Sequence, residues 1–434
     1  MTSETPEARL KRFLTWCEKV HLKMNPKVRL SMHGVAAGYG MLAVKPIASG
    51  EVLFVVPRSA VLSHSNTDIH QLLTAESPSL RSRSRWVPLL ITLMYESSHL
   101  DSPWAPYIAL WPNFLQADLP MFWPRDERRE LLRGTGVLQA TAQDLRNIRK
   151  EFRTVVAHFP SRHTDVFEPE RSNLELYTRL VAFVMAYSFQ ESRGGKKRNP
   201  PMMVPMADML NHTTNHNAQL EFSQDVLKMV AVRAIADGEE VFNTYGQLAN
   251  SQLLHMYGFT EPGSTNSNDT ARVPWVSLLR SALHGQGPKE RNLLRRKWRL
   301  LSQLTALDKE GILVGWDGVH SAGELEQVLK VLSMPKGQFG VYCKHQCWKK
   351  EVLKDYDTSL SNDAILNLPK ASRDLLLSGI QKTLATLAIF PQECKMQGKN
   401  VATHTERWQQ VLMLRQGQSK ILENLLELKE SSTE

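Results

Sequence analysis

The stretch from Asp208 to Asn217 reads DMLNHTTNHN and places two histidines, His212 and His216, four residues apart among small polar side chains. This spacing is that of a zinc-binding helix, but the glutamate of the HExxH pattern is absent. Asparagine and threonine also compete with the helical backbone for hydrogen bonds, so the segment is a poor helix former. The spacing therefore does not predict a metal site, and His216 receives no role.

Other catalytic signatures are missing from the sequence. It contains no P-loop and no GxSxG elbow. Gly38-Tyr39-Gly40 matches the start of a dinucleotide-binding fingerprint but lacks the third glycine and the following helix. The residues thus do not predict a kinase, a serine hydrolase or a dehydrogenase.

Composition points to a globular protein. The chain has 434 residues, of which 42% are hydrophobic and 22% charged, and this length allows two or three domains. We expect a soluble intracellular protein, because the N-terminus lacks a secretory signal and no apolar run approaches the roughly 18 residues of a membrane span. The four cysteines are too few and too scattered for a disulfide framework. Cys343, His345 and Cys347 are zinc-ligand types, but no fourth ligand lies at a familiar spacing.

Basic residues are in excess. Lys and Arg number 53 and Asp and Glu 44, so the net charge is +9, and the pI is near 9.3. Such a surplus favours acidic partners or nucleic acid. No helix-turn-helix, RNA-recognition or zinc-finger motif accompanies it, so nucleic-acid binding rests on charge alone. The more ordinary interpretation is a solvated surface, with nuclear import as one use of its basic clusters.

Hydrophobic periodicity divides the chain into segments. It predicts an N-terminal helix within residues 1–23 and strands from residue 24, then helices over about 65–190 and strands again over 202–246. Beyond 265 the pattern predicts helices to the end. We therefore predict an α+β protein: a β-fold over 24–260 with a helical insertion, followed by an all-α domain over 265–434.

One internal echo supports this division. Residues 47–54 and 235–242 share the pattern I-A-x-G-E-x-x-F, in which a glycine turn leads into an apolar strand. The two copies are too far apart for a tandem repeat. They predict that the β segments on either side of the helical insertion belong to one fold.

Three motifs follow one another along the chain: the glycine turn at 38–40, DMLNH at 208–212 and FNTYG at 242–246. Tyr257 follows them in HMYGF. This set resembles the SET-domain protein lysine methyltransferases. The layout is similar to the Rubisco large-subunit methyltransferase branch over essentially the whole chain. The resemblance implies a SET β-fold, S-adenosylmethionine as cofactor with no metal, and a helical substrate-binding domain at 265–434. No cysteine triplet follows Tyr245, so the zinc-binding tail of many histone methyltransferases is missing.

The resemblance also implies roles for single residues. Tyr245 is the catalytic tyrosine, whose hydroxyl faces the methyl group and the amine; a permanent phenolate is not expected from an ordinary pKa of about 10. The implied cofactor-binding residues are Ala37, Gly38, Tyr39, Tyr187, Asn211, His212 and Tyr257. The implied substrate-binding residues are Trp86, Ser188, Gln190 and Tyr245.

The implied reaction is monomethylation of a lysine in a transcription factor, such as a RelA-type NF-kappaB subunit, or in a chromatin protein. The resemblance implies a nuclear protein with the cytoplasm as second location, and neither a nucleic-acid nor a membrane partner. Two alternatives stay open: a catalytically silent SET-like scaffold for protein interactions, and a basic nucleic-acid-binding protein, which the charge surplus alone supports. A member of the wider family methylates histidine, so a histidine acceptor is a further alternative for the reaction itself. The basic loop at 191–200 departs from relatives that carry acidic sequence there.

Overall fold

The computed structural model describes residues 4–82, 84–111, 118–168, 170–191, 199–263, 265–303, 311–346, 359–390 and 401–431. Contacts within the chain divide it into two compact units. The first holds residues 1–122, 141–247 and 256–258, and the second holds 123–140, 248–255 and 259–434. The two units therefore interleave along the chain, whereas the boundaries predicted above follow chain order.

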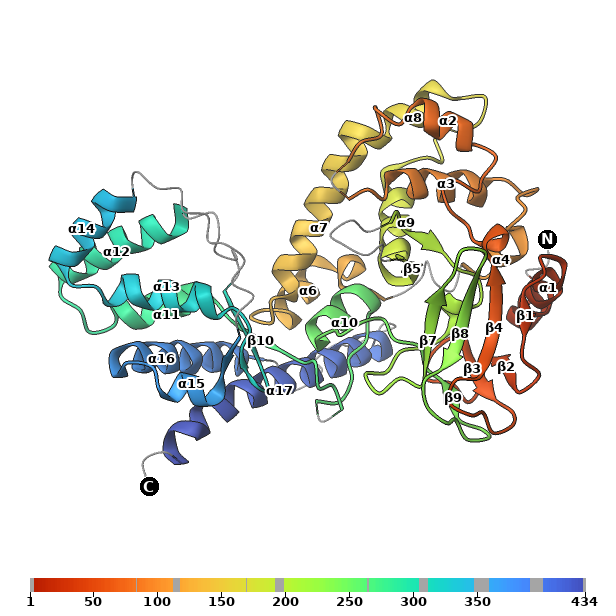
Figure 1. Cartoon of the computed structure of the whole chain (residues 1–434). Coiled ribbons are helices and arrows are strands. Elements are labelled where there is room, and N and C mark those ends of the chain that lie inside the picture. Colours follow the sequence, from red (N-terminus) through yellow and green to blue (C-terminus); the bar gives the residue numbers. More distant parts are fainter. Residues whose placement is uncertain are drawn as a thin grey trace. The chain divides into compact units, whose positions relative to one another are not determined.

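The first unit contains a four-stranded antiparallel sheet (Figure 1). Its order is β1 (Lys23–Met24), β4 (Val52–Pro57), β8 (Val226–Ala231) and β7 (Ala218–Phe222). Side chains of β8 alternate between buried and half-buried, as expected for a strand with one face on the core. Since β4 precedes the helical segment and β8 follows it, this pairing closes the β-fold around the insertion.

A second sheet, in the order β2 (Val28–Ser31), β3 (Gly40–Ala43) and β9 (Glu240–Val241), joins the same two parts of the chain. Ile47 and Ile235, the first residues of the two repeated segments, exchange backbone hydrogen bonds of 2.9 and 3.0 Å. This confirms that the repeated segments belong to one β-fold. A short pair, β5 (Ser188–Phe189) with β6 (Met202–Met203), completes the strands of this unit.

Helices fill the segment between β4 and β5, which confirms the predicted helical insertion. They are η1 (Arg58–Ala60), α2 (His70–Ala75), α3 (Val87–Ser98), α4 (Ala105–Ile108), η2 (Pro120–Phe122), α6 (Arg125–Leu131), α7 (Val137–Glu151), η3 (Phe152–Val156), α8 (His158–Arg162) and α9 (Leu174–Tyr187). The side chain of Asn173 caps α9 by accepting the N–H of Leu176 at 3.0 Å. The helix ends at Tyr187 because Ser188 is extended and enters β5.

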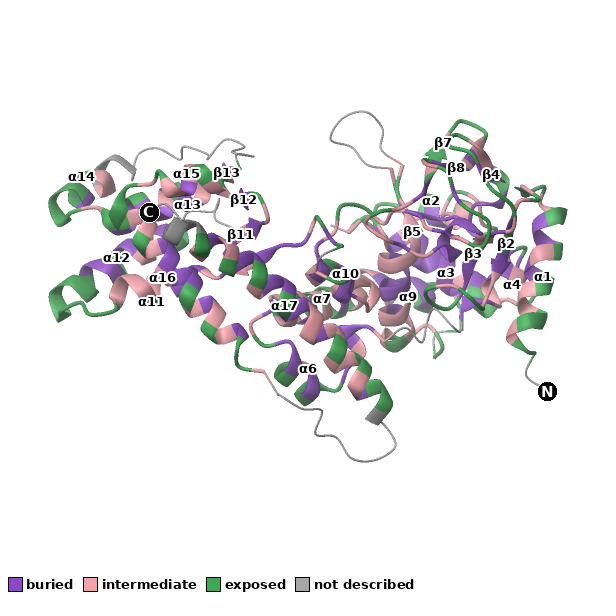
Figure 2. Ribbon diagram, turned by 90° about the horizontal axis from the view of Figure 1, so that it is seen from below, coloured by how far each residue is buried: buried purple, intermediate pink, exposed green. Residues whose placement is uncertain are grey.

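Helix α1 (Pro6–Lys19) packs into the core of the first unit rather than standing apart from it. Phe13, Trp16 and Cys17 are buried, and the rings of Phe13 and Trp16 contact Tyr107. The indole N–H of Trp16 donates to the carbonyl of Pro103 at 2.8 Å. Figure 2 shows the resulting pattern on this helix, buried on one side and exposed on the other.

The second unit is mainly helical but not all-α, so that part of the prediction was wrong. It contains a four-stranded sheet of β10 (Ala271–Val273), β11 (Ile312–Gly315), β12 (Gly318–Val319) and β13 (Leu360–Ser361). These strands are too short to show periodicity. Gly318 holds the hairpin close to β13, since its φ is +142° and a Cβ there would lie 2.1 Å from the carbonyl oxygen of Leu360. Such an approach is open only to glycine.

The helices around this sheet are α11 (Trp275–Leu283), α12 (Pro288–Gln303), α13 (Ala322–Ser333), α14 (Lys336–Gln346), α15 (Asn362–Leu366), α16 (Lys370–Leu387) and α17 (Val401–Ser431). They share one apolar core with the strands. Among the described residues, no helix has both the length and the apolar character needed to cross a membrane.

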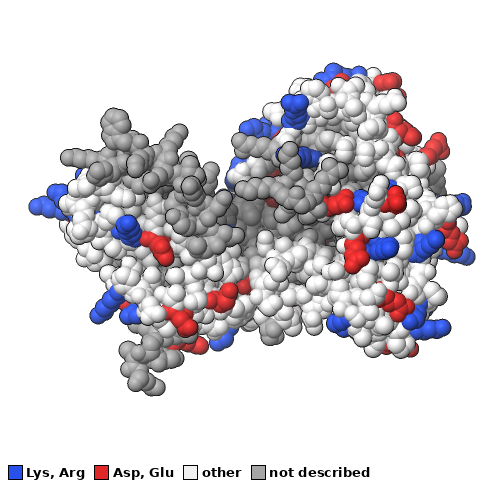
Figure 3. Space-filling view, viewed as in Figure 1, with Lys and Arg blue, Asp and Glu red and all other residues white. Residues whose placement is uncertain are grey.

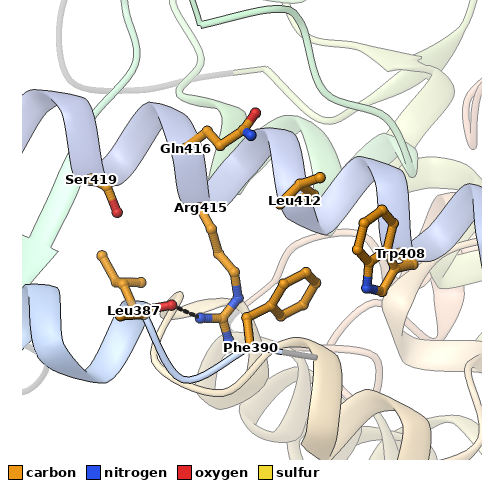
Figure 4. A pocket seen from close by; sticks show the side chains of 8 residues that line it. Leu387, Phe390, Trp408, Leu412, Arg415, Gln416 and Ser419 are labelled. Carbon is orange, nitrogen blue, oxygen red and sulfur yellow. Dashed lines mark hydrogen bonds between the residues drawn. The ribbon is translucent and has the colours of Figure 1, made fainter. Parts of the chain in front are cut away.

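A pocket of about 390 Å³ opens between the end of α16 and α17 (Figure 4). Phe390 and Trp408 stack with ring centroids 5.7 Å apart, and the Arg415 guanidinium lies over the Phe390 ring. Arg415 donates to the carbonyl of Leu387 at 2.6 Å and also to the carbonyls of Leu131 and Arg133. Because backbone carbonyls already occupy this guanidinium, it holds the unit together rather than presenting a charge to a ligand.

Candidate active site

The two polar motifs of the sequence meet in the first unit. His212 and Asn243 form a parallel backbone bridge, and the N–H of Asn243 donates to the carbonyl of Asn211 at 2.9 Å. The 3-10 turn η4 (Ala207–Met209) leads into this bridge from Met206, which has a φ of +75°. Such a φ is uncommon outside glycine and marks a constrained turn. DMLNH and FNTYG therefore lie side by side.

Tyr245 sits between two other rings. The His212 ring lies 4.9 Å from it, with an interplanar angle of 18°, and the Tyr257 ring lies 4.6 Å from it at 25°. The backbone N–H of Tyr245 donates to Nδ1 of His212 at 3.1 Å, so neutral His212 carries its proton on Nε2. Tyr257 reaches this stack as the last residue of α10 (Asn250–Tyr257).

The Tyr245 hydroxyl donates to the carbonyl of Leu210 at 2.9 Å. Burial raises its pKa well above 10, and the neighbouring Tyr187 and Tyr257 add to the effect. Burial likewise raises the pKa of Tyr257 to about 12, and that of Tyr187 is also raised. All three raised pKa values favour the neutral phenol at physiological pH, so Tyr245 carries a hydroxyl and not a phenolate.

The glycine turn is tied to Asn211. Nδ2 of Asn211 donates to the carbonyls of Ala37 and Tyr39, each at 3.1 Å. Gly38 between them is exposed and has a φ of +50°, and a Cβ built there meets no atom within 4 Å. The backbone of this turn is therefore open to close approach by a ligand, whereas Tyr39 is buried beneath it.

The three residues expected on the substrate side lie apart from these contacts. Trp86 is half-buried at the start of α3, where its backbone N–H donates to the Ser84 hydroxyl at 3.2 Å. Ser188 pairs with Met203 in the short β5–β6 ladder, and Gln190 is exposed. Within the part of the chain that the structure describes, no hydrogen bond or ring contact joins them to Tyr245. Their roles stay predictions.

Glu240 is a site residue that motif reading missed. Its carboxylate accepts Nδ2 of Asn211 at 2.7 Å through one oxygen and the N–H of Ala36 at 2.7 Å through the other. The residue is 9% exposed, and burial raises the pKa of its carboxyl while both hydrogen bonds oppose that shift. Only its place three residues before the FNTYG asparagine marks it in the sequence.

Asp208 is the second residue that was missed. It is buried, and Oδ2 accepts the hydroxyl of Tyr107. Burial raises the pKa of Asp208 to about 7, against an ordinary 3.8, and the Tyr107 hydrogen bond only partly offsets this. Burial raises the pKa of Tyr187 and of Cys17, and the charge of Asp208 adds to both shifts. Asp208 is thus a buried acidic group with a pKa near neutrality.

The two histidines of the motif have different hydrogen-bond partners. Nδ1 of His216 contacts the carbonyl of Thr214 at 3.3 Å, whereas Nδ1 of His212 accepts the backbone N–H of Tyr245. Over the described ranges, no three His, Cys, Asp or Glu side chains gather closely enough to hold a metal ion. The side chain of His345 and the whole of Cys347 lie outside the described residues, as does most of the basic loop at 191–200.

Comparison with known proteins identifies the family of the chain. The SET domain family matches residues 38–246. N-lysine methyltransferase setd6 of Xenopus laevis is 44% identical over 433 residues, which cover 97% of this chain and 95% of that protein. N-lysine methyltransferase SETD6 of Bos taurus is also 44% identical and covers 98% of this chain and 96% of the relative. The Homo sapiens protein of the same name is 42% identical, with 96% and 94% covered.

Solved structures share the fold. The SET domain of LSMT bound to lysine and AdoHcy aligns with a TM-score of 0.63 and 17% identity, over 99% of this chain and 92% of that one. Rubisco LSMT bound to AdoMet aligns with the same score and identity, over 98% and 92%. These alignments confirm the predicted α+β SET fold and helical C-terminal region. By its identity to relatives along almost its full length, the chain belongs to the SETD6 family of SET-domain N-lysine methyltransferases.

Proposed function

We propose that this chain transfers a methyl group from S-adenosylmethionine to the side-chain amine of a lysine in a protein substrate. The main observation in support of the proposal is the set of contacts that Tyr245 makes. Its ring is held between His212 and Tyr257, and its neutral hydroxyl points at the carbonyl of Leu210. A hydroxyl held in this way can orient an amine and complement positive charge without being ionised.

The residues around the glycine turn fit the cofactor. The open backbone at Gly38 allows close approach, and the Asn211 amide reaches the same turn. When bound, S-adenosylmethionine supplies an electrophilic methyl group on a sulfonium. We assign its binding to Ala37, Gly38, Tyr39, Tyr187, Asn211, His212 and Tyr257.

The same surroundings favour a reactive lysine. A free lysine has a pKa of about 10.4, and its ammonium form is not nucleophilic. Burial among the aromatic rings raises the pKa of Tyr187, Tyr245 and Tyr257, which shows that charge is disfavoured there. A lysine amine entering this space would have its pKa lowered for the same reason. We assign the peptide side to Trp86, Ser188 and Gln190.

We further propose that the substrate is a transcription factor, a RelA-type NF-kappaB subunit in particular, or a chromatin protein. The product would be monomethyllysine, and the protein would act in the nucleus with a cytoplasmic pool as second location. The resemblance to the family supports these points. Fluorescent tagging of the full chain tests the location, and exclusion of the tagged protein from the nucleus would contradict it.

The decisive assay incubates the full chain with S-adenosylmethionine and a panel of RelA, histone and unrelated lysine peptides, and counts methyl groups by mass spectrometry. Tyr245→Phe should lower kcat by about a hundredfold, as expected when one preorganised hydrogen-bonding group is removed. Tyr95→Phe is the matched control, because burial also raises the pKa of Tyr95 while its ring contacts His99 and Phe167 instead. Methylation of histidine peptides alone would overturn the lysine acceptor.

Two other functions make different predictions. A silent scaffold would bind proteins but show no turnover with any peptide, and wild type and Tyr245→Phe would not differ. A nucleic-acid-binding protein would show an affinity that falls steeply with salt. On the face shown in Figure 3, the basic side chains of the described residues are interspersed with acidic ones, which does not favour that function.

A further inference from the structure

Glu240 joins two parts of the cofactor site that are distant in sequence. It lies on β9, where it pairs with Leu42 of β3. Oε1 accepts Nδ2 of Asn211, and Oε2 accepts the N–H of Ala36, both at 2.7 Å. One carboxylate thus holds both Ala36, just before the glycine turn, and Asn211, which bonds to that turn.

These contacts also fix the orientation of the Asn211 side-chain amide, that is, the positions of Nδ2 and Oδ1. Nδ2 faces three oxygen acceptors: the carbonyls of Ala37 and Tyr39 and the Glu240 carboxylate. A flipped amide would place its oxygen against all three, and none of them can donate when Glu240 is ionised. The Asn211 side chain therefore presents Oδ1, an acceptor, on its other side.

The polarity of that oxygen matches one end of the cofactor. The amino-acid part of S-adenosylmethionine carries an ammonium, which only donates hydrogen bonds. An acceptor oxygen at Asn211 is complementary to it, whereas an amide NH₂ group would repel it.

We propose that Glu240 is a positioning residue of the cofactor site, which orients the Asn211 amide and holds the backbone at Ala36, just before the glycine turn, so that this surface recognises the ammonium of S-adenosylmethionine. The inference rests on the proposed function, since it assumes that this cofactor binds here. It adds a residue that acts through Asn211 and the turn.

Glu240→Gln tests it while keeping the size of the side chain. A glutamine has one acceptor oxygen where two are used, so its NH₂ must face either Ala36 N–H or Asn211 Nδ2. Titration calorimetry with S-adenosylhomocysteine should show a Kd raised by about tenfold or more, as expected when a charge-assisted hydrogen bond is lost. In ligand-free protein, hydrogen exchange at the Ala36 amide should become faster. At saturating cofactor, kcat and the peptide KM should change by no more than about threefold.

Glu239→Gln is the matched control. Its carboxylate accepts hydrogen bonds from Arg233, Asn217 and the N–H of Ala236. Within the described residues, none of its hydrogen bonds comes from Asn211 or Ala36. Its Kd should stay within about twofold of wild type, as for substitutions away from a binding site. If Glu240→Gln fails to fold, Glu240→Asp decides, because it keeps the charge but is too short to reach both partners.

The outcomes separate the two levels of inference. A wild-type protein that binds no S-adenosylhomocysteine or S-adenosylmethionine overturns the proposed function. Wild-type binding that Glu240→Gln and Glu240→Asp leave unchanged overturns the positioning role alone. Equal weakening by Glu239→Gln and Glu240→Gln also overturns it, since the effect would then come from charge or general stability.

Discussion

His212 and Tyr245 hold each other through two separate contacts: the Tyr245 N–H donates to Nδ1 of His212 at 3.1 Å, and their rings stack 4.9 Å apart. The hydrogen bond fixes the backbone of Tyr245, and the stack fixes the plane of its ring. The aromatic group expected to face the substrate is therefore positioned by the histidine of the preceding motif.

Two substitutions at His212 separate these contacts. His212→Asn keeps an acceptor near the Nδ1 position but loses the ring, and should cost about 0.5–1.5 kcal/mol of unfolding free energy. His212→Phe keeps the stack but leaves the Tyr245 N–H unsatisfied, and should cost about 1–3 kcal/mol. Denaturant unfolding measures both. A His212→Phe protein as stable as wild type would show that the hydrogen bond contributes nothing.

Gly40 should not tolerate a side chain. A Cβ there would lie 2.7 Å from Oε1 of Glu240 and 2.7 Å from Cβ of Val35, so Gly40→Ala must displace one of them. We expect a loss of about 1–3 kcal/mol of stability, typical of overpacking, together with weaker cofactor binding. Gly340→Ala is the control, because a Cβ there meets nothing within 4 Å on α14 and should stabilise by up to about 1 kcal/mol. Equal melting temperatures for the two variants would contradict the predicted clash.

Asp208 should make stability depend on pH. Its pKa is about 7 in the folded chain and 3.8 ordinarily, so the folded state binds the proton more tightly. This contribution to stability is fully present below pH 4 and is lost as the pH rises to about 7. At about 1.4 kcal/mol per pKa unit, the shift sets a ceiling of roughly 4 kcal/mol.

Asp208→Asn cannot ionise yet still accepts the Tyr107 hydroxyl. The variant should match wild type near pH 4 and exceed its stability at pH 8, as measured by unfolding at each pH. Asp101→Asn is the control, because Asp101 is exposed. The stability difference between this variant and wild type should not grow between pH 4 and pH 8. A constant difference between Asp208→Asn and wild type at all pH values would contradict the titration.

Arg415 should be irreplaceable by lysine. Its guanidinium donates to the carbonyls of Leu387, Leu131 and Arg133, and a lysine ammonium cannot reproduce this fork. Arg415→Lys should cost about 2–4 kcal/mol, because buried carbonyls lose their partners. The control is Lys420→Ala on the same helix, where the side chain is exposed and the change should stay within about 0.5 kcal/mol. Similar melting temperatures for both variants would show that the fork is not needed.

The sequence predicted the β-fold better than the C-terminal region. Ile47 and Ile235 stood in matching turns, and they pair directly. In the second unit, β11 and β12 are four and two residues long, so no alternation distinguished them from loops between amphipathic helices. Their pairing with β10 and β13 is a tertiary property, stabilised by the close approach that Gly318 permits.

The sequence alone determined the family, the α+β class and the tyrosine on which the proposed chemistry depends. Motifs such as FNTYG consist of neighbouring residues, so they can be recognised without the tertiary structure. Only the tertiary structure decided which groups surround it. The N–H of Ala36 meets Glu240 across 204 positions, and Tyr107 meets Asp208 across 101. No spacing pattern in the sequence marks either carboxylate, because burial and hydrogen-bond partners set its pKa. Both contacts form only when the two halves of the β-fold close around the insertion.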